Sequence, residues 1–211
     1  MFDISKYNEL TTQLWVTQLL AVTKYQSDET TLRAIQSWVW LIWESRVHDA
    51  QRKYTLIQDA GLDCEMHMIG HLQTNKVKDA IQIFDTIQSV DSIKLLRKIN
   101  QEIKSSQHKS YQDILLQLNL TWESQKYGFD QDKLWEMLWL CESLPYIRCD
   151  WLMCMGVLGD DAKTREIYAQ CRSLCDQYDL PHCSMGMSGD REIAVQEWST
   201  LVRVGSLLFD W

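Results

Sequence analysis

Residues 19–24 read Leu-Leu-Ala-Val-Thr-Lys, a short apolar run that ends on a lysine. Its length and its apolar, partly β-branched composition are typical of a buried strand. The next segment, Thr30–Trp38, places Leu32, Ile35 and Trp38 at intervals of three residues, which is typical of one face of a helix. We therefore interpret this part of the chain as a strand followed by a helix.

The same alternation of short apolar runs and amphipathic segments continues along the chain. In the expected helix Ala162–Tyr178, for example, Ile167, Cys171 and Leu174 recur at spacings of four and three residues. The expected strands are Leu19–Lys24, Val39–Ser45, Glu65–Gly70, Thr86–Ser92, Asp113–Leu120, Ile147–Met155, His182–Ser188 and Leu201–Phe209.

Strands separated by helices indicate a parallel sheet, because parallel strands need crossover connections. Eight such units close into a (β/α)8 barrel of the TIM type, and 211 residues suit one domain of that fold. We expect residues 1–211 to form this single domain, with residues 1–18 as an N-terminal helix packing on the barrel. A doubly wound open sheet is the alternative, but no Gly-x-Gly-x-x-Gly follows the first strand.

The composition excludes several classes of protein. A net charge of −8 without a basic run argues against binding nucleic acid, and no apolar stretch is long enough for a membrane span. The N-terminus does not resemble a signal peptide, so we expect a cytoplasmic protein with reduced thiols. Cys171 and Cys175, at helical spacing, could bind a metal or form a disulfide, but buried free thiols are the favoured interpretation.

Two segments near the C-terminus have the composition of a phosphate site. Residues 184–190 read Ser-Met-Gly-Met-Ser-Gly-Asp, and residues 203–206 read Arg-Val-Gly-Ser. Small residues let backbone N–H groups approach an anion, hydroxyls add donors, and Arg203 adds charge. These segments follow strands seven and eight, where barrels of this type often bind phosphate. Ordinary turns are the alternative interpretation for either segment alone.

Lys24 ends the first strand and is expected at the mouth of the barrel. A partly desolvated lysine there has a lowered pKa and attacks an aldehyde to form an imine. Together, the lysine and the phosphate segments predict pyridoxal 5′-phosphate, an aldehyde with a phosphate group. Two other signals are weaker: His67 and His71 do not form a neighbouring metal-binding pair on a strand, and no Gly-x-Ser-x-Gly hydrolase motif is present.

Several segments carry a resemblance to a known family. They are Ala-Val-Thr-Lys (21–24), Glu-Ser-Arg-Val (44–47), His-Met-Ile-Gly-His-Leu-Gln-Thr-Asn-Lys (67–76), Ser-Val-Asp (89–91), Gln-Lys-Tyr-Gly-Phe (125–129), Ser-Met-Gly-Met-Ser (184–188) and Leu-Val-Arg-Val-Gly (201–205). From about residue 19 onward, the chain resembles the pyridoxal phosphate homeostasis proteins of the YggS/PROSC type, which are related to the alanine racemase N-terminal barrel.

The resemblance implies a barrel that holds pyridoxal phosphate in a Schiff base on Lys24. It implies phosphate binding by Ser184, Gly186, Ser188, Arg203 and Gly205, with Ser45 and His67 also lining the cofactor pocket. Such proteins show no robust turnover, and they are expected to buffer the cofactor and pass it to apoenzymes as a monomer or weak dimer. No catalytic residue is therefore assigned.

An enzyme is the second hypothesis, namely a pyridoxal phosphate-dependent amino-acid racemase or lyase. It would need a second proton-transfer group near Lys24, for which His67 and, less well, Tyr127 are the candidates. In alanine racemases this group comes from a separate C-terminal domain. We expect no such domain here, because the sequence reaches Trp211 directly after the last expected strand.

Tryptophan is unusually frequent, with ten Trp against eight Gly. Where the family reads Gly-Glu-Asn-Arg-Val, residues 43–47 read Trp-Glu-Ser-Arg-Val, so Ser45 has a shorter reach than the usual asparagine. Strand alternation predicts that Trp43 points into the barrel, where it overpacks the interior. Further tryptophans stand where the family has glycine, at Trp38, Trp122, Trp151 and Trp198, and they strain any backbone with positive φ. A barrel whose pocket is blocked by tryptophan is thus a third hypothesis.

Overall fold

The computed structural model, which describes residues 1–106, 108–121 and 127–209, contains a closed barrel of parallel strands. Each strand pairs with its neighbours in sequence, and the first pairs with the last, with Ala21 opposite Val204. The fold predicted from the sequence is confirmed. The strands are β1 (Gln18–Val22), β2 (Leu41–Glu44), β3 (Glu65–Met68), β4 (Thr86–Val90), β5 (Gln112–Gln117), β6 (Ile147–Met153), β7 (His182–Met187) and β8 (Leu201–Val204).

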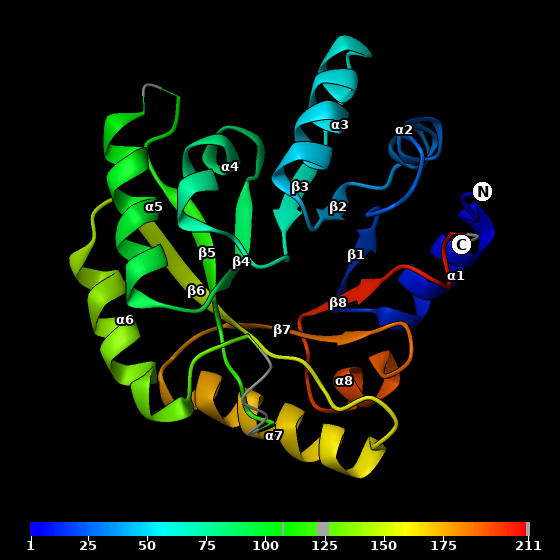
Figure 1. Cartoon of the computed structure of the whole chain (residues 1–211). Helices are drawn as coiled ribbons and strands as arrows, with labels where there is room; N and C mark the ends of the chain where they lie inside the picture. The colour runs from blue at the N-terminus through cyan, green and yellow to red at the C-terminus, as the bar shows by residue number, and fades with distance from the viewer. Residues whose placement is uncertain (107, 122–126, 210–211) are drawn as a thin grey trace.

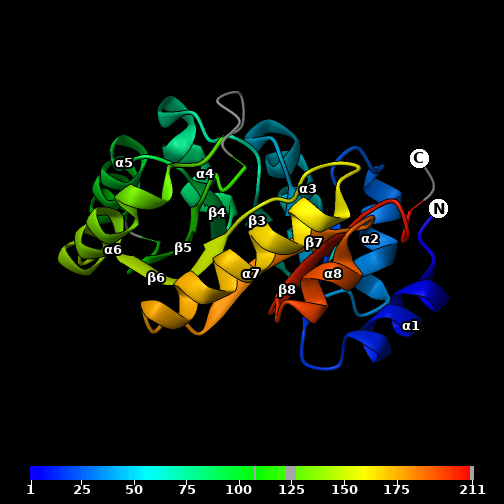
Figure 2. The ribbon, with the colours of Figure 1, turned by 90° about the horizontal axis from the view of Figure 1, so that it is seen from below.

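Helices surround the barrel, as Figures 1 and 2 show from two directions. Short 3-10 turns at Thr74–Lys76 and Gln131–Lys133 precede two of them. The two ends of the described chain lie side by side, and the backbone N–H of Asp3 donates to the carbonyl of Leu208. The helices are α1 (Ile4–Leu14), α2 (Asp28–Gln36), α3 (Val47–Asp59), α4 (Val77–Ile83), α5 (Ile93–Ser105), α6 (Leu134–Ser143), α7 (Asp161–Gln177) and α8 (Arg191–Gln196).

Side-chain caps fix where several helices begin. The side chains of Asp3, Ser27, Ser92 and Asp160 each accept a hydrogen bond from a backbone N–H in the first turn of α1, α2, α5 and α7. Such a cap satisfies a donor that has no partner within the helix, and it is worth about 1 kcal/mol. These short polar residues therefore set the strand-to-helix connections.

The buried apolar side chains form two clusters. The larger lies between the strands and the helices, and the smaller fills the barrel interior. Trp43 belongs to the interior cluster and is only 5% exposed, so the inward orientation predicted from strand alternation is confirmed. The other interior members are Leu20, Val22, Leu41, Ile69, Leu115, Met153 and Leu201.

The last strand is shorter than the sequence indicated. β8 ends at Val204, not at Phe209, because the N–H groups of Leu208 and Phe209 both turn back to donate to the carbonyl of Gly205. The apolar residues after Gly205 therefore belong to a turn, and Leu208 and Phe209 bury their side chains there. An apolar run alone does not separate a strand from a buried turn.

Three exposed tryptophans have backbone conformations that favour glycine. Trp15, Trp38 and Trp198 have φ angles of 54°, 68° and 61°, and each follows the end of a helix. The positive φ from which we expect strain is thus present at Trp38 and Trp198. Trp151 instead has ordinary strand geometry and stacks on His182 inside the barrel, with ring centroids 4.1 Å apart, and Trp122 lies outside the described residues.

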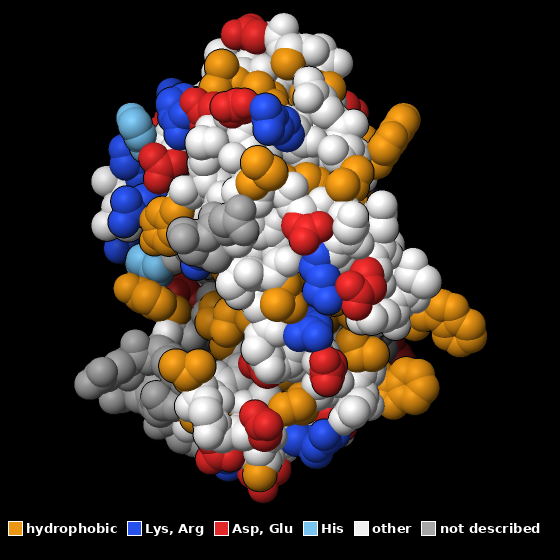
Figure 3. Space-filling model, turned by 90° about the vertical axis from the view of Figure 1, so that its right-hand side faces the viewer, with side chains coloured by type: hydrophobic (Ala, Val, Ile, Leu, Met, Phe, Trp, Pro, Cys, Tyr) orange, Lys and Arg blue, Asp and Glu red, His pale blue; other side chains and the backbone are white. Residues whose placement is uncertain are grey.

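The surface mixes charged and apolar side chains. Figure 3, which views the side carrying the chain ends, shows hydrophobic side chains that stand out from the surface among scattered acidic and basic groups. Cys171 and Cys175 are buried free thiols, as expected, and the other cysteines are also unpaired. In the described part of the chain, no helix combines the length and apolarity that crossing a bilayer demands.

Candidate functional site

Lys24 lies just beyond the carboxyl end of β1, at the mouth of the barrel. Its side chain is half-buried, and Nζ lies 4.7 Å from the ring centroid of Trp43 and 5.8 Å from that of Tyr25. Burial lowers the pKa of the Lys24 ammonium, and the negative charge of Glu44 partly offsets this shift. A lysine in this environment is more readily deprotonated, and therefore more nucleophilic, than one in water.

The segments after β7 and β8 meet at the same end of the barrel. The backbone N–H of Gly205 donates to Oγ of Ser188 over 3.1 Å, which joins the two segments that the sequence marked for phosphate. Within the first of them, Gly186 has a φ of 93°, and a Cβ there would lie 2.5 Å from the Cβ of Ala194. Only glycine fits this position, which lies next to the last residue of β7.

Arg203 places a buried cation between β7 and β8. The side chain is 1% exposed; Nη1 donates to the carbonyl and to Oγ of Ser184, and Nη2 donates to the carbonyl of Cys154. Its Nε has no partner, and among the described residues no carboxylate forms an ion pair with it. Because a buried charge without a counterion is unfavourable, burial lowers the pKa of Arg203, and the residue is suited to meet an anion.

A chain of hydrogen bonds crosses the barrel interior from Arg203. Ser184 Oγ accepts from Arg203 over 2.6 Å and donates to Oε1 of Gln88 on β4 over 2.8 Å. The amide Nε2 of Gln88 in turn donates to Nδ1 of His67 over 2.6 Å, and Nε2 of His67 donates to Glu65 over 2.9 Å. This chain fixes the orientation of Ser184 and Arg203 from the opposite wall of the barrel.

The structure places His67 differently from the other predicted site residues. The imidazole is buried and lines a cavity of about 320 Å³ at the amino-terminal end of the barrel, together with Glu65 and Asp113. The hydrogen bond from His67 is the main cause that lowers the pKa of Glu65. His67 is therefore linked to Ser184 and Arg203 through Gln88, and among the described residues its hydrogen bonds go to Glu65 and Gln88 and not to Lys24.

The two histidines of the sequence motif do not converge. His71 stacks on Tyr127, with ring centroids 4.4 Å apart, and its Nδ1 lies 3.4 Å from Oδ2 of Asp91. In residues 1–106, 108–121 and 127–209, no group of His, Cys, Asp and Glu has a geometry suited to a metal ion. The metal interpretation thus gains no support.

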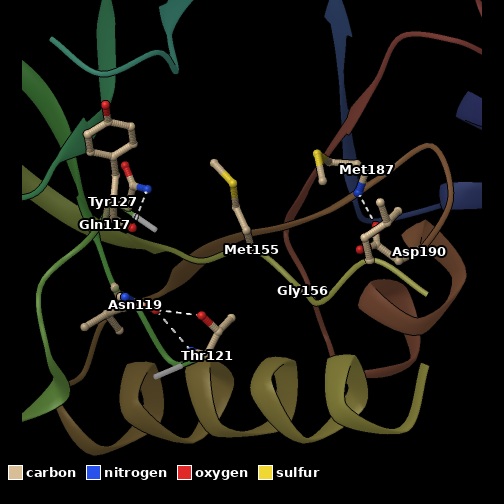
Figure 4. Close-up of a pocket in the computed structure, with 10 residues that line it drawn as sticks. Gln117, Asn119, Thr121, Tyr127, Met155, Gly156, Met187 and Asp190 are labelled. Carbon is tan, nitrogen blue, oxygen red and sulfur yellow. Dashed lines mark hydrogen bonds between the residues drawn. The ribbon is translucent and has the colours of Figure 1, made fainter. Parts of the chain in front are cut away.

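A cavity of about 360 Å³ opens at the carboxyl end of the barrel, beside the loop that follows β7. Figure 4 shows Met155 in its middle, with Gln117 and Tyr127 on one side and Met187 and Asp190 on the other. Asp190 holds the loop after β7, because its carboxylate accepts from the N–H of Met187 over 2.6 Å and from the hydroxyl of Tyr168 over 2.8 Å. Sequence reasoning did not assign Gln88 or Asp190 to the site.

Ser45 and Trp43 lie on the β2 side of the mouth. Ser45 directly follows β2, and its carbonyl approaches Gly70 so closely that a Cβ on Gly70 would lie 2.1 Å from it. The ammonium of Lys24 lies over the indole of Trp43, whose buried Nε1 has no hydrogen-bond partner among the described residues. The indole of Trp43 therefore occupies space directly beside the amine of Lys24.

Comparisons with known proteins agree with this arrangement. The sequence model of the family described as "Alanine racemase, N-terminal domain" matches residues 6–210. The pyridoxal phosphate homeostasis protein of Aquifex aeolicus is 35% identical over 173 residues, which cover 79% of this chain and 74% of that protein. This chain belongs to the pyridoxal phosphate homeostasis protein family.

Other family members match over almost the whole chain. The homeostasis protein of Synechocystis is 30% identical, with 99% of this chain and 98% of that protein covered. The solved structure of PipY from Synechococcus elongatus with pyridoxal phosphate bound is 30% identical, with a TM-score of 0.89 over 98% of this chain and 99% of that one. An alanine racemase of Clostridium difficile, 16% identical, has a TM-score of 0.75 and covers 98% of this chain but 56% of that one, so it shows the shared barrel fold.

Proposed function

We propose that this homeostasis-family protein binds pyridoxal 5′-phosphate, holds it as a Schiff base on Lys24, and supplies it to apoenzymes in the cytoplasm without robust turnover. The observation that carries the proposal is Arg203, a buried guanidinium that forms no ion pair with a carboxylate of the described residues, on the strand that pairs with the strand leading to Lys24. The PipY structure, which contains the same cofactor, supports it. A monomer or weak dimer is the expected state.

The residues at the mouth fit the phosphate and the aldehyde of this cofactor. Arg203, Ser184, Ser188 and the backbone N–H of Gly205 would hold the phosphate, and Gly186 keeps the loop open to it. When bound, the cofactor supplies an aldehyde that condenses with amines. Lys24 provides the amine, and its burial increases the deprotonated fraction at neutral pH.

The absorbance spectrum with Lys24→Ala as the comparison tests this proposal. Wild-type protein mixed with pyridoxal phosphate should show the visible band of a protonated imine, and borohydride should fix the cofactor on Lys24, as peptide mass spectrometry would reveal. Lys24→Ala should lose the band completely, whereas Lys94→Ala, which removes an exposed lysine on α5, should keep it. An unchanged band in Lys24→Ala would refute the assignment of this lysine.

Gln88 offers a second prediction, which does not depend on imine chemistry. Replacing Gln88 with leucine removes the acceptor that orients Ser184, so Arg203 loses part of its fixed position. We expect affinity for pyridoxine 5′-phosphate, which lacks the aldehyde, to fall by about 5- to 20-fold, the equivalent of a lost buried hydrogen bond. Isothermal titration measures this, and an unchanged affinity would show that the chain across the barrel does not support the anion site.

The other two hypotheses differ in their support. His67 contacts Glu65 and Gln88, and Tyr127 stacks on His71, so neither candidate acid–base residue of an enzyme interacts with Lys24. Amino-acid α-proton exchange in deuterated water by the loaded protein would favour the enzyme. The blocked barrel rests on a specific observation, the indole of Trp43 beneath Lys24, and it predicts that neither the wild type nor Lys24→Ala acquires the imine band.

A further inference from the structure

A buried ion pair lies behind the segment that carries Lys24. Nζ of Lys53, on α3, is 2.6 Å from Oε1 of Glu44, at the end of β2, and the two side chains are 2% and 1% exposed. Removing two such charges from water costs several kcal/mol per ion, so a buried pair is weak evidence of stabilisation. A buried pair of this kind is better explained by what it positions.

What the pair positions is Thr23, the residue directly before Lys24. The ammonium of Lys53 donates to the carbonyl of Thr23 over 2.7 Å, and the hydroxyl of Thr23 donates to Glu44 over 2.7 Å. The Thr23 backbone N–H donates to the carbonyl of Trp43 over 3.1 Å. The chain is therefore held from three sides at the point where it leaves β1, and the next side chain is the lysine at the mouth.

We propose that Glu44 and Lys53 are positioning residues for Lys24: together they clamp the backbone at Thr23 and set the electric field at the lysine amine. This inference rests on the proposed role of Lys24 in binding the cofactor. The inference adds Glu44 and Lys53 to the residues that serve the cofactor site. They act on Lys24 indirectly, through the backbone of Thr23 and through their charges.

Two further cations, Arg46 and Arg203, lie after β2 and on β8, the strands that pair with β1, and their charges do not change in the test below. Arg46 follows β2 and lies 6.0 Å from the ring of Tyr25, which itself neighbours Lys24. Arg203 on β8 faces the barrel interior, opposite Leu20 of β1. In the part of the chain that the structure describes, Glu44 and Lys53 are the ion pair that contacts Thr23, so substitutions there change the field at Lys24 from one side.

The two single substitutions have effects of opposite sign. Glu44→Gln removes the negative charge that favours the ammonium form, so the pKa of Lys24 should fall further below its ordinary value. Lys53→Met leaves the carboxylate of Glu44 without its counterion, so the pKa of Lys24 should rise. Each shift is expected to be about one pH unit, the lower end of the usual effect of one nearby charge.

Competitive labelling with acetic anhydride measures the pKa of Lys24 in the cofactor-free protein of each variant. The fraction of Lys24 acetylated, read by peptide mass spectrometry across a pH series, reports the titration of its amine without any imine. Circular dichroism selects the pH range in which each variant remains folded. The proposal is supported if the acetylation profiles of Glu44→Gln and Lys53→Met move in opposite directions along the pH axis, because loss of packing alone would not give shifts of opposite sign. If both profiles move in the same direction, or if neither moves, the proposal is overturned.

The double variant Glu44→Gln/Lys53→Met covers the case in which a single variant unfolds. It buries no charge, so it should remain folded, and because the two single effects oppose each other, its Lys24 profile should lie between those of the single variants. A profile that coincides with that of either single variant would refute the proposal. Glu29→Gln/Arg33→Met, which removes an exposed pair on α2, is the matched control and should leave the profile unchanged.

Imine formation is then measured separately by absorbance. If the wild type forms no imine while the labelling profiles still move in opposite directions, the proposed function fails and the positioning role stands. If the wild type forms the imine but the profiles do not move, the positioning role alone fails.

Discussion

Replacing Trp43 with glycine is expected to raise the affinity for pyridoxal phosphate by about 5- to 150-fold. The indole is 5% exposed, lies inside the barrel, and sits 4.7 Å from the lysine that would hold the cofactor. Any ligand at the mouth must share this space with the indole or displace it, and such overpacking typically costs about 1–3 kcal/mol, which converts to that range of affinity. Titration of the imine band in both proteins measures the change.

The same substitution should destabilise the cofactor-free protein. A tryptophan packed among Leu20, Val22 and Met153 fills volume that glycine leaves empty, and such truncations commonly cost about 3–5 kcal/mol. Bound cofactor should restore part of this loss by mass action, so the melting temperature of Trp43→Gly should depend more strongly on cofactor concentration than that of the wild type.

Trp151→Gly provides the control for the Trp43 experiment. It also removes an indole from the barrel interior, but Trp151 stacks on His182 and lines the cavity at the amino-terminal end. It should lower stability without raising cofactor affinity. Equal gains in affinity from both variants would show that general loosening of the barrel, not relief at the mouth, is responsible.

The combined variant Trp15→Gly/Trp38→Gly/Trp198→Gly is expected to be more stable than the wild type by about 2–3 kcal/mol. All three tryptophans have positive φ, which costs a residue with a side chain about 1–2 kcal/mol. Their side chains are 93%, 89% and 73% exposed, so little packing is lost. Glycine also has more conformational freedom in the unfolded chain, and this lowers the free energy of unfolding by part of the amount gained at each site.

Thermal unfolding tests this prediction, with an expected rise in Tm of about 4–12 °C for a chain of this size. Trp139→Gly is the matched control, because Trp139 is also exposed, at 58%, but lies in the interior of α6. Glycine in a helix interior is unfavourable, so this control should lower Tm. A Tm of the triple variant at or below that of the wild type would show that these positions do not strain the backbone.

The sequence predicted the barrel well because each strand is a separate apolar run and each connection carries a helical stripe. The candidate site was predicted where chemistry is local: Lys24 ends a strand, and Ser188 and Gly205 lie in small-residue turns, which the structure joins by a hydrogen bond. The burial of Arg203 was not predicted from the sequence, because it depends on strands that meet only in the folded barrel.

The parts that sequence reasoning missed depend on depth and on distant partners. Strand alternation predicts that His67 faces the interior, but it does not tell the carboxyl end from the amino end, and His67 lines the amino-terminal cavity. Gln88 and Lys53 carry no local signal, because a glutamine in a strand and a lysine on a helix are ordinary. Their roles arise from partners across the barrel or on another element.

The tryptophans with positive φ also bear on how the gene is read. At positions 15, 38 and 198 the backbone conformation is one that glycine adopts freely and tryptophan does not. Tryptophan and glycine codons differ by a single base, and a codon that different genetic codes read as tryptophan or as glycine would produce this pattern. The mass of the protein isolated from its own cells therefore decides which residue the ribosome inserts at these turns.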